Sequence, residues 1–117
     1  KLTAELCKDY VANGLYTVVA AFDADKIVGF GAICQSQSLY AEGLFGIIQE
    51  FYVMPDYRSN GVGKGLIKEI TKFAKKNEWK RLELCTPPVP EFDRAVEFYK
   101  SNSFEITGGY KMKCGII

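Results

Sequence analysis

The sequence contains no histidine, and its four cysteines are far apart along the chain, at Cys7, Cys34, Cys85 and Cys114. Without histidine, and without a Cys-x-x-Cys pair, the chain lacks the usual ligands of a zinc site and the usual base that activates a catalytic serine or cysteine. We therefore expect no metal centre. We interpret the cysteines as reduced residues, with Cys34 and Cys85 as small apolar residues in strands.

Net charge and long hydrophobic runs are also scarce. Lys and Arg number 15 and Asp and Glu 14, for a formal net charge of +1, which gives no general electrostatic reason to expect a nucleic acid or an anionic membrane as partner. No apolar run approaches the roughly 20 residues of a membrane span, and no signal peptide is visible. We expect a cytoplasmic protein, and the length of 117 residues predicts one domain over residues 1–117.

The most informative stretch is a glycine-rich segment between a predicted strand and a predicted helix. Residues 44–54 are rich in β-branched and aromatic residues, whereas residues 62–74 carry apolar side chains at the spacing of one helical face. Between them, Gly61, Gly63 and Gly65 permit positive φ and the close approach of a ligand. The first N–H groups of the helix have no partner inside it. Such a turn is typical of anion sites, above all for phosphates.

The glycine spacing excludes two common phosphate loops. A Walker loop needs a hydroxyl residue after its lysine, but Gly65 follows Lys64, and a dinucleotide fingerprint needs glycine where Leu66 stands. The pattern from Val53 to Gly63 reads Val-x-Pro-x-Tyr-Arg-x-x-Gly-x-Gly. This pattern resembles the acetyl-CoA loop of the GNAT superfamily of acyl-CoA-dependent N-acyltransferases.

Periodicity predicts the other elements. We expect an antiparallel hairpin over residues 15–35, in which Gly29 and Gly31 indicate close backbone packing or a bulge, then a loop over residues 36–43. The strands on either side of the central helix should be parallel, with a right-handed crossover. Pro87 to Pro90 should form a loop and Asp93 should cap the next helix. The predicted helices are 2–12, 62–76 and 94–102, and the predicted strands are 15–22, 27–35, 44–54, 81–86, 104–107 and 110–116.

This order of elements is similar to the GNAT fold from its second helix onward, over almost the whole chain. The resemblance implies an α/β (α+β) protein with a central mixed, twisted sheet of about six strands flanked by helices, and with the first strand and helix of the fold missing. A second signature, residues 95–104, is similar to the family's Ala-x-x-Phe-Tyr-x-x-x-Gly-Phe helix end. Two positions depart from the family pattern: Ser103 stands where glycine is preferred, and Phe92 where an asparagine often contacts the cofactor.

The resemblance also implies a binding site for acetyl-CoA, the acyl donor. Backbone N–H groups of the glycine turn would surround the pyrophosphate, and Arg58 and Lys64 would add positive charge. In the family, the strand before the turn carries a bulge and separates from its parallel neighbour, and the pantetheine arm inserts there. An N–H near Val53 would face the oxyanion. The residues that we predict to bind the cofactor are Phe51, Tyr52, Val53, Arg58, Ser59, Asn60, Gly61, Val62, Gly63 and Lys64.

Two residues are candidates for catalysis. Tyr99 aligns with the tyrosine that many family members use to protonate the leaving thiolate. A thiol titrates near ~8.5 and a tyrosine near ~10, so a phenol is protonated at neutral pH and close enough in acidity to donate. On spacing alone, Tyr99 would be a core residue of an amphipathic helix. Glu50 is the only nearby carboxylate; it could accept the proton of the amine directly or through water, or it could be an exposed strand residue with no role in catalysis.

These observations lead to one hypothesis and one alternative. The hypothesis is an N-acetyltransferase that transfers the acetyl group of acetyl-CoA to a primary amine of a small molecule or protein, by direct attack in a ternary complex. The alternative is a non-catalytic acyl-CoA-binding or sensor module, motivated by Phe92, Ser103 and the missing N-terminal elements. Because the first strand is missing, the hairpin should leave a sheet edge that a partner chain or a missing segment must cover, and we expect a homodimer.

Overall fold

A computed structural model describes residues 2–87 and 89–116. The chain divides into two compact units, Lys1–Cys85 and Thr86–Ile117, and each is described by itself. The single domain inferred from chain length stays a prediction. One residue of the predicted proline-rich loop, Pro88, lies outside the described residues.

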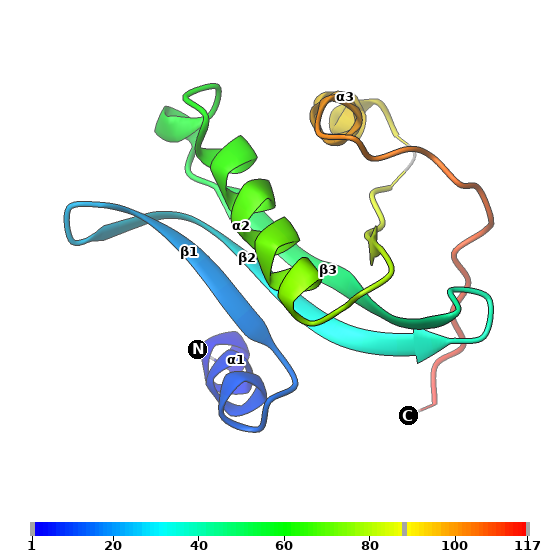
Figure 1. The fold of residues 1–117 in the computed structure, drawn as a ribbon. Coiled ribbons are helices and arrows are strands. Elements are labelled where there is room, and N and C mark those ends of the chain that lie inside the picture. Colours follow the sequence, from blue (N-terminus) through cyan, green and yellow to red (C-terminus); the bar gives the residue numbers. More distant parts are fainter. Residues whose placement is uncertain (1, 88, 117) are drawn as a thin grey trace. The chain divides into compact units, whose positions relative to one another are not determined.

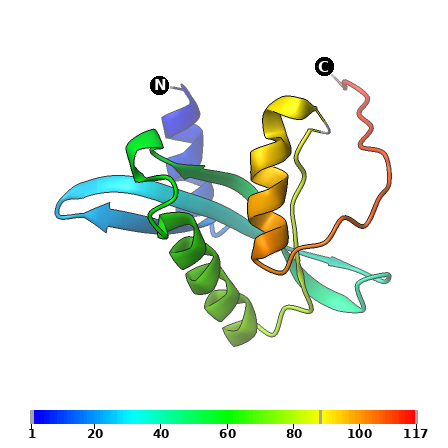
Figure 2. The ribbon, with the colours of Figure 1, turned by 90° about the horizontal axis from the view of Figure 1, so that it is seen from above.

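The first unit contains a mixed sheet with helices on both faces (Figures 1 and 2). Among the described residues the sheet has four strands in the order β1-β2-β3-β4; the first three are antiparallel, and β4 is parallel to β3. The predicted hairpin and the parallel strand–helix–strand unit are therefore confirmed. The elements are α1 (Leu2–Ala12), β1 (Thr17–Asp23), β2 (Lys26–Ser38), β3 (Gly43–Val53), the 3-10 helix η1 (Pro55–Tyr57), α2 (Val62–Lys76) and β4 (Leu82–Glu83).

Helix α2 packs closely on β2 because that strand carries glycine at two contact positions. A Cβ atom at Gly31 would lie 2.9 Å from Cδ1 of Ile70, and one at Gly29 would lie 3.2 Å from Cγ1 of Val62. The close packing that these glycines predict is confirmed. Most of the described core lies between α2 and the sheet, where Ile33 and Ile70 are fully buried.

Trp79, which follows α2, packs the C-terminal end of that helix against the sheet. Its indole Nε1 donates a hydrogen bond to Oε1 of Gln35 (2.7 Å), and its ring meets the ring of Phe73 edge-on, with 5.4 Å between centroids. A Cβ atom at Gly46 would overlap the Trp79 ring, so β3 needs glycine at this position. This contact fixes the second half of the strand–helix–strand unit relative to its first strand.

Two boundaries in the first unit differ from the sequence prediction. The predicted loop over residues 36–43 is a shorter turn over residues 39–42, because Ser36 pairs with Phe45 and Ser38 with Gly43. Polar residues therefore continue the hairpin where their composition indicated a loop. The strand expected over residues 81–86 comprises only Leu82–Glu83.

The second unit contains the 3-10 helix η2 (Pro90–Phe92) and helix α3 (Asp93–Ser101). The expectation that Asp93 caps this helix is wrong. Phe92 occupies the N-cap position without a side-chain cap hydrogen bond, and Asp93 is the first helical residue. The 3-10 turn that begins at Pro90 leads directly into α3, which moves the helix start by one residue.

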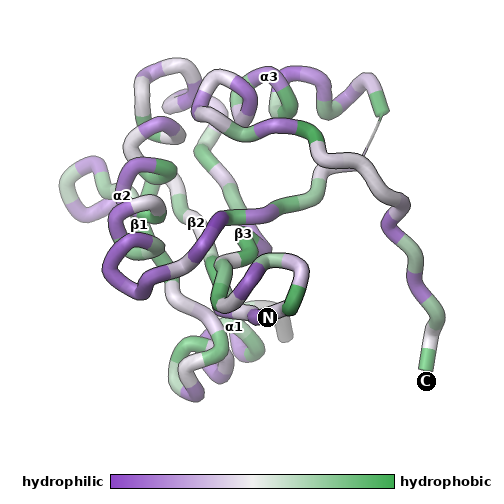
Figure 3. Tube along the Cα trace, turned by 45° about the vertical axis from the view of Figure 1, so that its right-hand side comes forward, coloured by the Kyte–Doolittle hydropathy of each residue, from purple (hydrophilic) through white to green (hydrophobic). Residues whose placement is uncertain are grey.

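The two strands expected over residues 104–107 and 110–116 are absent from the described residues. Hydrophobic and hydrophilic residues do alternate along this segment, as Figure 3 shows for the part of the tube that leads to the C-terminus. From Ile106 onward its large apolar side chains are exposed, however, with 95% of Tyr110 and 90% of Ile116 accessible. The sheet of the described residues therefore has four strands and not about six.

Each α-helix of the described residues ends in the same hydrogen-bond motif, in which a residue with positive φ follows the helix. In α3 this residue is Ser103, with φ of 76°; its N–H donates to the carbonyl of Lys100, and the N–H of Phe104 donates to the carbonyl of Tyr99. This is a Schellman motif, and the rings of Tyr99 and Phe104 supply its hydrophobic contact, with 5.6 Å between centroids. The serine that departs from the family glycine therefore adopts a left-handed conformation.

We expect Ser103→Gly to stabilise the protein by about 1 kcal/mol, because a left-handed conformation costs roughly 1–2 kcal/mol for a residue with a Cβ atom and nothing comparable for glycine. The midpoint of thermal or urea unfolding would show the gain. Gly14 has φ of 71° at the equivalent position after α1, so Gly14→Ser is the reverse control and should destabilise. Unchanged stability in both variants would contradict the assigned strain.

Candidate active site

The turn between η1 and α2 presents unpaired N–H groups at a helix start. Ser59 and Gly61 have φ of 69° and 84°, and Gly61 is the N-cap of α2 with no side-chain cap hydrogen bond. The carbonyl of Gly61 accepts from the N–H of Gly65 (3.0 Å), so the N–H groups of the first helical positions, Val62 to Lys64, precede the first bond inside the helix. They form the positive end of the helix dipole, where anions are favoured.

The space beside this turn is open. An added Cβ atom at Gly61 or Gly65 would meet no heavy atom within 4 Å. The side chains of Ser59, Asn60 and Lys64 are exposed around it. Residues 59–64, which the sequence predicts to bind a pyrophosphate, thus form one continuous surface with helix N–H groups and a cation. The donor set fits a diphosphate.

Arg58 is held at the end of β3. Its Nε donates to the carbonyl oxygen of Val53 (2.8 Å), and its guanidinium carbon lies 5.5 Å from the centre of the Tyr52 ring. These contacts fix the side chain beside the turn and leave the terminal nitrogens of the guanidinium for an anion. Its role toward CoA stays a prediction.

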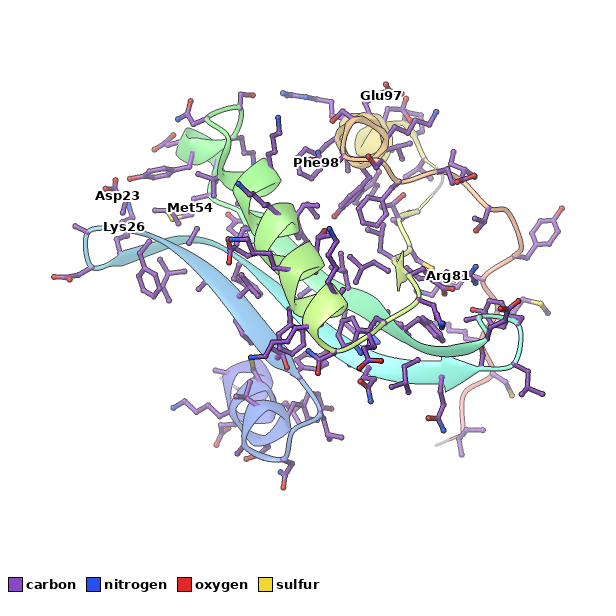
Figure 4. The ribbon with its side chains drawn as sticks, viewed as in Figure 1. Asp23, Lys26, Met54, Arg81, Glu97 and Phe98 are labelled. Carbon is purple, nitrogen blue, oxygen red and sulfur yellow. The ribbon has the colours of Figure 1, made fainter. Side chains whose placement is uncertain are left out.

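A contact that the sequence analysis did not find ties the turn to the β1–β2 hairpin. The hydroxyl of Tyr57 donates to Oδ2 of Asp23, and Nζ of Lys26 lies 5.8 Å from the centre of the Tyr57 ring. Figure 4 shows Asp23 and Lys26 at the tip of the hairpin, near Met54. The bond to Asp23 raises the pKa of Tyr57 above its ordinary value. Residues 34 positions apart hold η1 in place, and no local pattern could reveal their pairing.

Strand β3 has the bulge and the separation that the resemblance implies. Ala32 pairs with Glu50 and Ile33 with Ile48, so Gln49 is an extra residue in β3. Pairing with β4 is confined to Gly46 and Ile47, whereas β3 continues along β2 as far as Val53. The two parallel strands therefore separate next to the bulge.

The N–H groups of Phe51 and Val53 point away from β2. The N–H of Met54 donates to the carbonyl of Val28 (2.8 Å), and N–H groups of successive residues in a strand point to opposite sides. The bond from Arg58 to the carbonyl of Val53 agrees with this direction. Backbone groups at two of the predicted positions thus face the side on which β3 separates from β4.

Glu50 is exposed on β3 and is held by a residue that the sequence analysis did not single out. The hydroxyl of Tyr16 donates to Oε2 of Glu50 at 2.9 Å. Burial of the Tyr16 ring, followed by the hydrogen bond and the charge of Glu50, raises the pKa of Tyr16 to about 12. Tyr16 precedes β1, 34 residues before Glu50, so only the three-dimensional fold brings them together.

Tyr99 lies on α3, in the second unit, whereas all the other predicted site residues belong to the first unit. It is half-buried, its ring lies 5.3 Å from the ring of Phe98 between centroids, and burial raises the pKa of its phenol above the ordinary value. The phenol therefore stays protonated through the neutral range, as a general acid must. Its catalytic role stays a prediction.

Two absences complete the description of residues 2–87 and 89–116. This part of the chain holds no group of three or more Cys, Asp or Glu side chains that could bind a metal ion. None of its helices combines the length and the apolar character needed to cross a membrane.

Comparison with known proteins identifies the class. The family model described as acetyltransferase (GNAT) domain matches residues 13–106. An uncharacterized N-acetyltransferase of Methanocaldococcus jannaschii is 40% identical over 81 residues; the match covers 68% of this chain and 35% of that protein. This chain thus spans about a third of the length of that relative. The chain belongs to the GNAT acetyltransferase family, and the resemblance inferred from its glycine turn is confirmed.

Solved structures agree with the fold. An aminoglycoside acetyltransferase from an uncultured soil metagenomic sample superposes with a TM-score of 0.75 at 22% identity, over 94% of this chain and 74% of that one. A ribosomal-protein-alanine N-acetyltransferase from Brucella melitensis biovar Abortus 2308 gives 0.73 at 21% identity, over 93% and 78%. At these identities the similarity shows the fold alone, which is the mixed α+β architecture of GNAT acetyltransferases with four strands among the described residues.

Proposed function

We propose that this chain binds acetyl-CoA and transfers its acetyl group to a primary amine by direct attack in a ternary complex. The observation that carries the proposal is the N-terminus of α2 beside the end of β3, where Gly61 adopts a left-handed conformation and an added Cβ atom at Gly61 or Gly65 would meet no heavy atom within 4 Å. That geometry suits a diphosphate. In acetyl-CoA, the diphosphate is joined to the pantetheine arm that carries the thioester.

The separation of β3 from β4 supports the placement of this arm. The N–H group of Val53 points to the side where β4 has left β3. An acceptor group of an extended arm can bond to it as a neighbouring strand would. The thioester would then lie near the bulge at Gln49 and the carboxylate of Glu50.

The reaction assigns one task to each predicted residue. The acceptor nitrogen loses a proton, for which Glu50 is the candidate base, and then attacks the thioester carbon. The carbonyl oxygen becomes an oxyanion that the N–H of Val53 can stabilise. When the carbon–sulfur bond breaks, the thiolate takes a proton, for which Tyr99 is the candidate donor. The products are an N-acetyl amine and free CoA.

A non-catalytic acyl-CoA-binding module is the alternative, and one position favours it. Phe92, where the family often has asparagine, is the N-cap of α3 and is 41% exposed. An apolar side chain there would supply no polar contact to CoA. Such a module would retain the glycine turn and lose only the chemistry.

Thiol release separates the two candidates. We would incubate the protein with acetyl-CoA and a panel comprising a polyamine, an aminoglycoside, a peptide with a free N-terminal alanine and a peptide with an internal lysine. Amine-dependent release of CoA, with the acetylated product seen by mass spectrometry, supports the enzyme. Binding of acetyl-CoA without turnover on any amine favours the sensor.

The charge balance of the chain bears on which other partners to expect. The near balance of 15 basic and 14 acidic residues gives no reason for a nucleic acid or a membrane as partner, and a cytoplasmic location is part of the proposal. The acceptor is a small molecule or a protein with a primary amine.

We also expect a homodimer. Strand β1 pairs only with β2 among the described residues, which leaves its other edge without a neighbour, and Phe22 is 61% exposed. Open strand edges pair readily with another chain. Light scattering should give twice the mass of one chain at micromolar concentration. A soluble monomer at every concentration would contradict this prediction.

A further inference from the structure

A cluster of polar side chains lies on the face of the sheet opposite α2, next to the bulge of β3. Gly29 and Gly31 face α2, and side chains alternate along β2, so Ala32 and Cys34 face the other side. Glu50 pairs with Ala32 and shares that face. The cluster comprises Tyr16, Cys34, Gln49 and Glu50, with Nε2 of Gln49 3.5 Å from Sγ of Cys34 and the hydroxyl of Tyr16 2.9 Å from Oε2 of Glu50.

Contacts with Tyr10 of α1 fix the position of Tyr16. The backbone N–H of Tyr16 donates to the carbonyl of Tyr10 (3.1 Å), and the two rings meet edge-on with 5.1 Å between centroids. Helix α1 lies on this face of the sheet (Figures 1 and 2). The hydroxyl that reaches Glu50 is thus anchored by a helix and not by an exposed loop.

One carboxylate oxygen of Glu50 accepts a hydrogen bond, and the other is available to a ligand. Oε2 accepts from Tyr16, and within the described residues no second hydrogen bond or ion pair reaches this exposed side chain. The hydrogen bond from Tyr16 restricts the Glu50 side chain to fewer rotamers. Less conformational entropy is then lost when Glu50 forms an ion pair with a ligand. Oε1 then presents its lone pairs to a cation.

We propose that Tyr16 is a positioning residue that holds Glu50 to bind the ammonium group of a cationic primary-amine acceptor. This inference rests on the proposed function and narrows its substrate class to amines that reach the enzyme protonated, from the sheet face that carries α1. Tyr16 itself does not exchange a proton in the reaction. Its contribution should therefore appear in the binding of the amine more than in kcat.

The ionisation of Tyr16 agrees with this role. The groups that face it are Tyr10, Cys34 and Glu50, and burial with the Glu50 bond raises the pKa of Tyr16 to about 12. Since the raised value retains the proton, the phenol remains a neutral donor throughout an assay range of about pH 6–9. The effect of removing the hydroxyl should consequently be the same at every pH in this range.

The test is steady-state kinetics of Tyr16→Phe with the most active amine of the panel. We expect KM for the amine to rise about 5- to 10-fold, kcat to stay within about threefold and KM for acetyl-CoA to stay unchanged, since a hydrogen bond to a charged group is worth about 10-fold or more and exposure reduces it. Tyr40→Phe is the matched control. It removes the same kind of bond, from Tyr40 to Oε2 of Glu83 at 2.9 Å, and should leave all three constants within twofold.

A double-mutant cycle tests whether Tyr16 acts through Glu50. Glu50→Gln should raise KM for the amine at least 10-fold, and in that background Tyr16→Phe should add less than twofold. If Tyr16→Phe fails to fold, the KM of Glu50→Gln decides alone. An amine KM within twofold of the parent in either single variant, or additive effects, would overturn the inference and leave the proposed function standing. Absence of turnover on every amine would overturn both.

Discussion

Gly63→Asp should weaken CoA binding by about 100-fold or more while leaving the protein folded. Gly63 is the second residue of α2, among the N–H groups that precede the first bond inside the helix. A carboxylate there would lie against the diphosphate, and placing like charges together at a binding site costs several kcal/mol, where 1.4 kcal/mol corresponds to 10-fold. The same carboxylate favours the helix itself, because negative charge stabilises a helix N-terminus by about 0.3–1 kcal/mol.

Calorimetry with CoA measures this effect, and two further variants separate its causes. Gly63→Ala adds a Cβ atom without charge and should cost less affinity than Gly63→Asp. Gly14→Asp adds the same charge after α1, where nothing lies within 4 Å of an added Cβ atom, and should bind CoA as the parent does. Unchanged affinity in Gly63→Asp would contradict the placement of the diphosphate at α2.

Tyr99→Phe should lower kcat by about 10²–10⁴ with little change in KM, because general acid catalysis is typically worth that factor and the proton is needed chiefly in the transition state. The substitution keeps the ring that contacts Phe98 and Phe104. Folding and CoA affinity should therefore survive. Tyr110→Phe is the matched control, since Tyr110 is 95% exposed in the same unit, and it should retain full activity.

The pH profile gives a second measure of this role. Burial raises the pKa of Tyr99 above its ordinary value of 10.0, so the phenol keeps its proton to higher pH than a free tyrosine. A limb of declining rate that reports Tyr99 should lie above pH 10 and should vanish or move in Tyr99→Phe. If the turnover rate of Tyr99→Phe stays within twofold of that of the parent, Tyr99 contributes only to packing. The thiolate then leaves unprotonated or takes a proton from water.

Local patterns predicted the elements that depend on local chemistry. Helices α1 and α2 begin and end where periodicity places them, because Gly14 ends α1 and apolar residues of α2 recur on one face. The β1–β2 hairpin follows from two segments of largely apolar residues joined by a short polar turn. The position of the glycine turn could also be predicted, because the positive-φ conformations of Ser59 and Gly61 depend on the local sequence of that segment.

Features that depend on a distant partner could not be predicted in the same way. The segment after α3 alternates as a strand does, but a strand also needs a neighbouring edge, and none of residues 104–116 pairs with one in the described structure. β4 is short because β3 leaves it near the bulge at Gln49. The bonds of Tyr16 to Glu50 and of Tyr57 to Asp23 each span 34 residues.

Backbone NMR of the protein during titration with CoA would locate the bound cofactor residue by residue. We expect the amide signals of Val62, Gly63 and Lys64 to shift together with that of Val53, because in the proposed complex these groups receive the diphosphate and the pantetheine arm. Signals from the hairpin turn at residues 39–42 should stay in place. Binding that moves other amides and leaves those of residues 62–64 unchanged would show that the diphosphate does not bind at the start of α2.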